Sequence, residues 1–434
     1  MRYIEGRERH QVVLFPEKLD DYVKENNEVR FLDAYVDQLD MVEMGFTHSE
    51  TKETGRKPYN PADLLKLYIY GYLHKLRSGR DLENATHYNL ELIWLMKGLK
   101  PDFKTICDFR KDNKKGIRNT FKEFVRLCKE LNLISLERFA IDGSKFAAVN
   151  SNKRNYSKTA LKRLTDKIEK EIDRYLSQLD ENDKKTDEIW ELSNSELKDK
   201  IRQLKEKANK YNDLLDQVEE SGESQISLTD PDSRMMKDKQ NRDVCFNVQI
   251  VVDEKNKLIV EQDVTSDEVD LNQAHRMGAK TRATLDLRKF CITLDKGYFK
   301  KEEIKKCDEA NIDCVIPEPK KGHSKSKGLF TYQEFKYNKS EDIYTCPAGH
   351  KLCLEGEVIK HGSKHKIYGT KKCKGCSIRS RCTQSKKNGR KIHRWIYEDT
   401  IDEMRRRNES MSDFKDKRKA LVEHPFGTIK RGMN

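Results

Sequence analysis

At 434 residues the chain is longer than a single hydrophobic core usually supports, so two or three domains are expected. Only 35% of the residues are hydrophobic while 37% are charged, and no apolar run reaches the roughly 18 residues of a membrane-spanning helix. The charged N-terminus lacks the apolar core of a signal peptide. We therefore expect a cytoplasmic protein without membrane contact, whose thiols stay reduced.

The positive charge is concentrated in one segment. The whole chain has a net charge of +13, and residues 317–395 hold 20 Lys and Arg against 6 Asp and Glu, a balance of +14. A basic block of this kind favours a polyanionic partner, because neutralising phosphates releases their counterions. A merely solubilising surface is the alternative.

Residues 1–133 have the pattern of a helical domain. Asn60 is a predicted N-cap and Pro61 occupies the first helical position, which is a favoured helix start. Further helices are predicted over residues 81–89, 90–99 and 105–133. Short helices with tight turns suit a helix-turn-helix-like DNA-binding domain, and they suit a plain helical bundle equally well. We predict a DNA-binding domain over 1–133, without identifying its contact face.

From residue 134 onward the pattern becomes mixed. A helix is predicted from about residue 300 to 311, and the predicted strands are residues 136–142, 245–253, 257–264, 289–295 and 314–317. The first of these strands is expected to end at Asp142. Strands, a hairpin and then alternating helix and strand predict a mixed α/β domain over 134–434.

A charged helical segment interrupts this domain at residues 157–228. The downstream half has a strict heptad seam, and the upstream half has a matching apolar stripe. The seam consists of Leu197, Ile201, Leu204, Ala208, Tyr211, Leu215 and Val218. Three heptads are short for a free coiled coil, so we predict an antiparallel helical hairpin, with a dimerisation arm as the alternative.

Three acidic motifs lie far apart in the chain: FAIDGSK around Asp142, ITLDKGYF around Asp295 and VEHPFGTIKR around Glu423. The two aspartates end apolar runs, with a glycine one residue after Asp142 and two residues after Asp295, and the glutamate lies in a predicted helix. Two strand-end carboxylates and one helical carboxylate suit a pair of Mg²⁺ ions, which clamp the attacking and leaving oxygens in phosphodiester chemistry. An ordinary Asp-Gly turn is the alternative for each aspartate.

The eleven cysteines fall into two groups. Six lie in apolar stretches and are predicted core residues: Cys107, Cys128, Cys245, Cys291, Cys307 and Cys314. The others cluster among lysines and glycines, and their spacing favours tetrahedral Zn²⁺ over a reduced loop with incidental thiols. The preferred ligands are Cys346, Cys373, Cys376 and Cys382, with Cys353 or His350 as substitutes.

This basic, cysteine-rich insertion, residues 318–396, is also predicted to bind DNA. Aromatic residues are interleaved with its lysines and could stack on bases, namely Tyr332, Tyr337, Tyr344, Tyr368 and Trp395. A zinc site would supply the folding energy that its few apolar residues cannot.

The motifs together resemble a known family. The three acidic motifs, TDPDSRMM (229–236), YNPADLLKLYIYGYLHKLRSGRDLE (59–83) and the cysteine cluster occur in the order found in bacterial insertion-sequence transposases of the DDE class. That resemblance implies an RNase H-like catalytic domain with Asp142, Asp295 and Glu423 as its triad, holding two Mg²⁺ or Mn²⁺ ions. It also implies that Lys430 contacts transposon-end phosphate, and we expect Arg431, Arg418 and Lys296 to contact DNA as well.

The resemblance implies an enzyme that binds terminal repeats as a homodimer on double-stranded DNA, cleaves them and joins them to target DNA, in the cytoplasm at the nucleoid. Two departures favour an alternative. Phe414 and Lys415 occupy the region where a tyrosine is expected, and the sequence stops at Asn434, eleven residues past Glu423. A truncated, inactive DNA-binding remnant or regulator is therefore the second hypothesis. An RNase H-like nuclease without strand transfer is the third.

Overall fold

The computed structural model describes residues 18–49, 57–148, 154–182, 188–238, 241–319, 328–360, 362–385 and 387–432. Its contacts divide the chain into two units. The helical unit comprises Met1–Ser135, Lys255–Val260 and Glu423–Asn434, and the core unit comprises Leu136–Glu254 and Glu261–Val422. Among the described residues, no helix is both long and apolar enough to cross a membrane.

The N-terminal part of the helical unit consists of short helices. They are η1 (Leu19–Tyr22), α1 (Glu28–Asp37), α2 (Met41–Met44), α3 (Pro61–Leu73), α4 (Gly79–Tyr88), α5 (Leu90–Leu95), α6 (Phe103–Asp112) and α7 (Lys114–Glu130). The predicted start of α3 is confirmed, since the Asn60 side chain accepts a hydrogen bond from the Ala62 N–H. The region 105–133 is broken at Asn113, whose side chain instead bonds to the Phe109 carbonyl and the Thr47 N–H.

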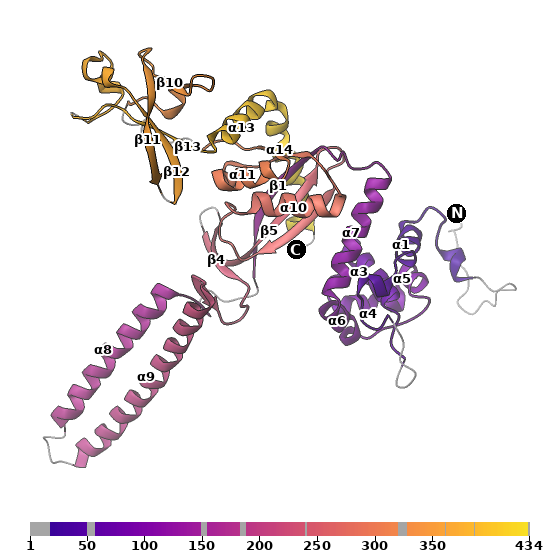
Figure 1. Cartoon of the computed structure of the whole chain (residues 1–434). Coiled ribbons are helices and arrows are strands. Elements are labelled where there is room, and N and C mark those ends of the chain that lie inside the picture. Colours follow the sequence, from indigo (N-terminus) through magenta and orange to yellow (C-terminus); the bar gives the residue numbers. More distant parts are fainter. Residues whose placement is uncertain are drawn as a thin grey trace, which may run out of the picture. The chain divides into compact units, whose positions relative to one another are not determined.

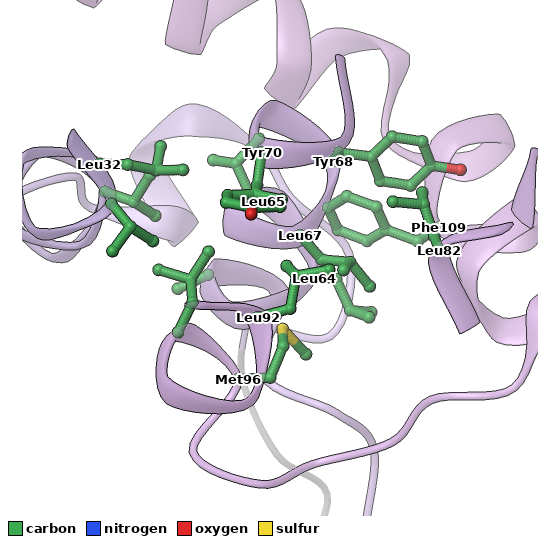
Figure 2. Close-up of a cluster of buried hydrophobic side chains, with 14 of the residues drawn as sticks. Leu32, Leu64, Leu65, Leu67, Tyr68, Tyr70, Leu82, Leu92, Met96 and Phe109 are labelled. Atoms are coloured by element: carbon green, nitrogen blue, oxygen red, sulfur yellow. The ribbon is translucent and has the colours of Figure 1, made fainter. Parts of the chain in front are cut away.

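Helix α3 is the centre of this unit, and it is buried on almost every side. Figure 2 shows Leu64, Leu65 and Leu67 from this helix packed among side chains of the surrounding helices. Lys66 lies in the same buried stretch with no exposed surface, and its ammonium group pairs with Asp33 and Asp37 at 2.5 and 2.6 Å. This pairing allows a charged side chain in a helix surrounded by apolar contacts.

The core unit is built on a six-stranded sheet of order β4-β5-β1-β7-β8, with β6 paired to β5. The strands are β1 (Arg138–Ala147), β4 (Arg234–Asp238), β5 (Asn241–Asp253), β6 (Ile259–Thr265), β7 (Phe290–Thr293) and β8 (Ile312–Val315). Strand β1 is antiparallel to β5 and parallel to β7, so the sheet is mixed. The predicted α/β fold of RNase H-like type is confirmed.

Helices α10 (Gln273–Leu285), α11 (Lys301–Glu309) and α13 (Glu398–Ser410) pack with this sheet (Figure 1). Gly278 allows α10 to approach closely, because a Cβ there would lie 2.9 Å from the Ile312 Cδ1 atom. Asn408 on α13 donates to the Ile316 carbonyl at 2.7 Å, just after β8. Helix α14 (Ser412–Gly432) follows and continues into the helical unit.

The predicted helical hairpin is confirmed. Helices α8 (Lys158–Asn182) and α9 (Glu188–Ser221) run side by side (Figure 1), and the short strands β2 (Asn155–Ser157) and β3 (Gln225–Ser227) pair at their base. Two apolar clusters join the helices, one around Leu161 and Val218 and the other around Leu179 and Ile201.

The cysteine-rich insertion forms its own five-stranded sheet, of order β13-β12-β11-β10-β9. Its elements are η4 (Tyr332–Glu334), β9 (Lys336–Asn338), β10 (Ile343–Thr345), β11 (Lys351–Lys360), β12 (Ser363–Gly369), η5 (Lys371–Gly375), η6 (Arg379–Arg381) and β13 (Ile392–Trp395). The stacking role predicted for its aromatic residues is wrong for Tyr344, Tyr368 and Trp395, which are buried. In this small sheet, Tyr344 and Tyr368 belong to the apolar core together with Phe330, Phe335, Leu352 and Ile392.

The cysteines are all free thiols. Five of the six predicted core cysteines are buried, but the prediction for Cys107 is wrong. That residue lies on the exposed side of α6, next to the backbone of Gly79.

Candidate active site

Asp142 lies inside strand β1, not at its end as the sequence predicted. The strand continues to Ala147 because it pairs with β5 over its whole length, with Asp142 opposite Ile250 and Gly143 opposite Gln249. The Asp142 carboxylate accepts a hydrogen bond from the Gly143 N–H at 3.0 Å. Its other oxygen lies 3.2 Å from an Arg418 guanidinium nitrogen.

Asp295 lies two residues beyond β7, the parallel neighbour of β1. Its carboxylate caps the short helix η3 (Lys296–Tyr298) by accepting from the Gly297 N–H at 2.7 Å. The side chain is half-buried, and the following Lys296 is exposed. Parallel neighbouring strands thus bring both predicted aspartates to one region of the sheet.

The two aspartates interact electrostatically. Burial is the main cause that raises the pKa of Asp142 above its usual value, and the nearby Asp295 carboxylate raises it further; the Arg418 guanidinium and the Gly143 N–H act in the opposite direction. Two carboxylates that repel each other in a partly buried site fit a divalent cation, because hard oxygen ligands are what Mg²⁺ prefers and its charge removes the repulsion. Among the described residues, no group of three or more His, Cys, Asp and Glu side chains is arranged to hold a metal ion.

Helix α14 carries the remaining predicted site residues. Arg418 belongs to the core unit and pairs with Asp142, and its contact with DNA stays a prediction. Glu423, Lys430 and Arg431 lie further along the helix, in the part assigned to the helical unit, and Glu423 and Arg431 are exposed. Pro425 lies inside the helix, where it has no N–H to donate to the Leu421 carbonyl.

Sequence reasoning missed a polar network behind Gly143. Asn247 and Gln249 are fully buried on β5 and bond to Asp270, and Tyr298 bonds to Gln249. A detectable signal was present, because two polar residues two positions apart in an apolar strand share one face of the sheet.

A second candidate site lies in the cysteine-rich insertion. A cavity of about 20 Å³ is lined by all four preferred ligands together with His350. Cys346 follows β10, Cys373 and Cys376 lie at η5, and Cys382 follows η6. Cys353 lies outside this lining and is exposed on β11. Burial and then the neighbouring cysteines raise the pKa of the Cys382 thiol, against the opposing effect of Arg390.

Two family models match the chain. Residues 17–112 match a model described as a transposase domain (DUF772), and residues 345–434, which include Glu423, match one described as a transposase DDE domain. The two matches support an insertion-sequence transposase of the DDE class. Asp142 and Asp295 lie between the two matched segments. No curated protein and no solved structure gives a significant match.

Proposed function

We propose that this transposase binds the terminal repeats of its element, cleaves DNA strands there and joins the ends to target DNA. The observation that carries the proposal is the pair Asp142 and Asp295. The first lies on β1, the second lies two residues beyond the parallel strand β7, and the two carboxylates interact in a partly buried site. Glu423 is the proposed third carboxylate, on the strength of the family resemblance. The enzyme would act as a homodimer on double-stranded DNA at the nucleoid.

The proposed chemistry needs divalent cations. Mg²⁺ or Mn²⁺, held by Asp142, Asp295 and Glu423, would activate the attacking oxygen and stabilise the leaving oxygen. The protein's own side chains would hold the substrate. Lys296 is exposed beside Asp295, and Lys430 and Arg431 lie in the last turn of α14, where cationic side chains can contact phosphates.

The test is a cleavage and joining assay with a duplex that carries a repeat end of the element. We expect Mg²⁺-dependent nicking at the end, followed by covalent joining of that end to a target plasmid, detected on a sequencing gel. Nicking without joined product would favour a nuclease without strand transfer. Binding without cleavage in both Mg²⁺ and Mn²⁺ would favour the regulator hypothesis.

We also propose a structural Zn²⁺ bound by Cys346, Cys373, Cys376 and Cys382, with His350 as the available substitute. The supporting observation is that one small cavity is lined by all of them, although they come from separate turns of the insertion. The surrounding segment is strongly basic, so a zinc-stabilised insertion would present lysines and arginines to the DNA backbone.

We assign the DNA-contacting face of the helical unit to the start of α4 and the exposed side of α6. The Arg80 guanidinium lies 5.1 Å from the Phe103 ring centroid, and the Arg110 side chain bonds to Tyr72. Phe103 and Tyr72 are themselves exposed. Residues 72–111 carry eight Lys and Arg against five Asp and Glu, a charge balance that suits phosphates. Arginines held by aromatic rings are preorganised for such contacts.

This assignment predicts that Arg80→Ala and Arg110→Ala weaken binding of a repeat-end duplex, each lowering the slope of log affinity against log salt by about 1. Fluorescence anisotropy over a salt series measures both effects. Arg126→Ala is the matched control, because Arg126 on α7 is exposed but paired with Glu123. Equal losses in all three variants would contradict the assignment.

A further inference from the structure

A continuous chain of buried polar groups lies behind the two aspartates. The Tyr298 hydroxyl donates to the Gln249 side-chain carbonyl at 2.5 Å. The Gln249 amide nitrogen donates to Asp270 at 2.7 Å and to the Asn247 side-chain carbonyl at 3.0 Å. Asn247 in turn donates to Asp270 at 2.8 Å. Tyr298, Gln249 and Asn247 have no exposed surface, whereas about a quarter of the Asp270 side chain is exposed.

This network touches both aspartate motifs. Tyr298 is the last residue of η3, the helix that Asp295 caps, so its position is tied to that of Asp295. Gly143 directly follows Asp142, and a Cβ there would clash with the Gln249 amide nitrogen and lie 2.8 Å from an Asp270 oxygen. The glycine therefore lets the network lie directly against the backbone that carries Asp142.

The groups of the network have fixed roles as donors and acceptors. Burial, and then the carboxylates of Asp270, Asp142 and Asp295, raise the pKa of Tyr298 well above its usual value, so its hydroxyl remains a donor. Each amide is satisfied on more than one side. A satisfied network of this kind is rigid, because moving any member would leave a buried polar group without its partner.

We propose that the Tyr298–Gln249–Asp270 network, supported by Asn247, sets the spacing and direction of the Asp142 and Asp295 carboxylates for metal binding. This inference rests on the proposed function. The four side chains are positioning residues: they act through the aspartates and do not touch the DNA. Metal sites need their ligands held within about 0.5 Å of the productive geometry, and an apolar core would pack these strands without fixing that geometry.

The test uses Tyr298→Phe, which removes one hydroxyl and keeps the ring. We expect the dissociation constant for Mn²⁺, measured by calorimetry on the full-length zinc-loaded chain without DNA, to rise about tenfold, since partners of metal ligands typically contribute 10- to 100-fold. The Mn²⁺ concentration for half-maximal nicking should rise in parallel, while duplex affinity stays unchanged. Asp270→Ala, at the exposed end of the network, should also raise the dissociation constant for Mn²⁺. This second variant tests the inference if Tyr298→Phe does not fold.

Tyr368→Phe is the matched control. Tyr368 is fully buried in the insertion and donates to Asp342 at 2.6 Å, so the variant loses a comparable hydrogen bond away from the aspartates. It should lower the melting temperature without changing Mn²⁺ affinity. If the wild-type chain binds Mn²⁺ and both network variants match it within twofold, the inference is overturned while the proposed function stands. A wild-type chain that binds no Mn²⁺ overturns the metal site and this inference together.

Discussion

We expect Asp142→Asn and Asp295→Asn each to lower Mg²⁺-dependent nicking and joining of a repeat-end duplex by roughly 10³-fold or more. The loss is large because removing a metal ligand removes several kcal/mol of charge stabilisation in the transition state, and each 1.4 kcal/mol is about tenfold in rate. Asparagine keeps the acceptor that caps η3 through Gly297, so the local backbone should be retained. Duplex affinity in a gel shift should stay unchanged.

Asp286→Asn is the control for this pair. Asp286 is an exposed aspartate of the core unit at the end of α10, with a left-handed backbone (φ of 49°) that asparagine also tolerates. It should nick at the wild-type rate. Wild-type activity in Asp142→Asn or Asp295→Asn would remove the assigned metal site, and equal loss in Asp286→Asn would show that the effect is not specific.

The melting temperature of Asp142→Asn shows whether its loss of activity comes from a missing metal ligand or from a destabilised fold. Folding raises the pKa of Asp142, so it disfavours the ionised carboxylate. The contribution of Asp142 to the free energy of unfolding is therefore present at low pH and is lost as pH rises through the pKa of the folded state. The amide has no such loss. We therefore expect the variant to melt at or above the wild-type temperature at pH 7, with the difference shrinking toward pH 4. A lower melting temperature at pH 7 would mean that the Arg418 pair outweighs burial.

The second large effect is expected at the cysteine cavity. Cys376→Ser should release about one equivalent of zinc, measured by atomic absorption, and should make the insertion sensitive to proteolysis. The reason is that binding of a structural zinc contributes roughly 10–16 kcal/mol in small domains, more than the insertion's few apolar residues can replace. A chelator should have the same effect on the wild-type chain.

Cys353→Ser is the matched control, because this cysteine lies on β11 of the same insertion, is exposed and does not line the cavity. It should retain its zinc and its protease resistance. The apparent zinc affinity should also strengthen as pH rises, since the raised pKa of Cys382 means that zinc must displace a proton there. Zinc content that is equal in the two variants would contradict the proposed ligand set.

Local sequence patterns predicted helices correctly where the pattern itself specifies the contacts that stabilise them. The helix start at Asn60 and Pro61 is confirmed because capping is a contact between near neighbours. The hairpin of α8 and α9 is confirmed because a heptad seam specifies its own partner face. In the seam, Leu214 is more deeply buried than the predicted Leu215.

Local patterns gave wrong predictions where a segment distant in sequence determines the length of a strand or the burial of a side chain. Strand β1 runs past Asp142 because β5, about a hundred residues later, offers a full set of hydrogen-bonding partners. Tyr344 and Tyr368 look like stacking residues among lysines, but they are large apolar surfaces in a small sheet and are buried in its core. Cys107 lies in an apolar stretch, yet the face of α6 that carries it is exposed.

The sequence by itself indicated the class of protein, the order of its elements and the residues of both candidate metal sites. These follow from the spacing of motifs and from the chemistry of single side chains. Only the tertiary structure showed that Asp142 and Asp295 interact, that Arg418 pairs with Asp142, and that Tyr298, Gln249 and Asp270 form one network behind them. Those relations depend on strand register and on burial. Both are settled by contacts between segments that lie up to about 280 residues apart, which no local pattern records.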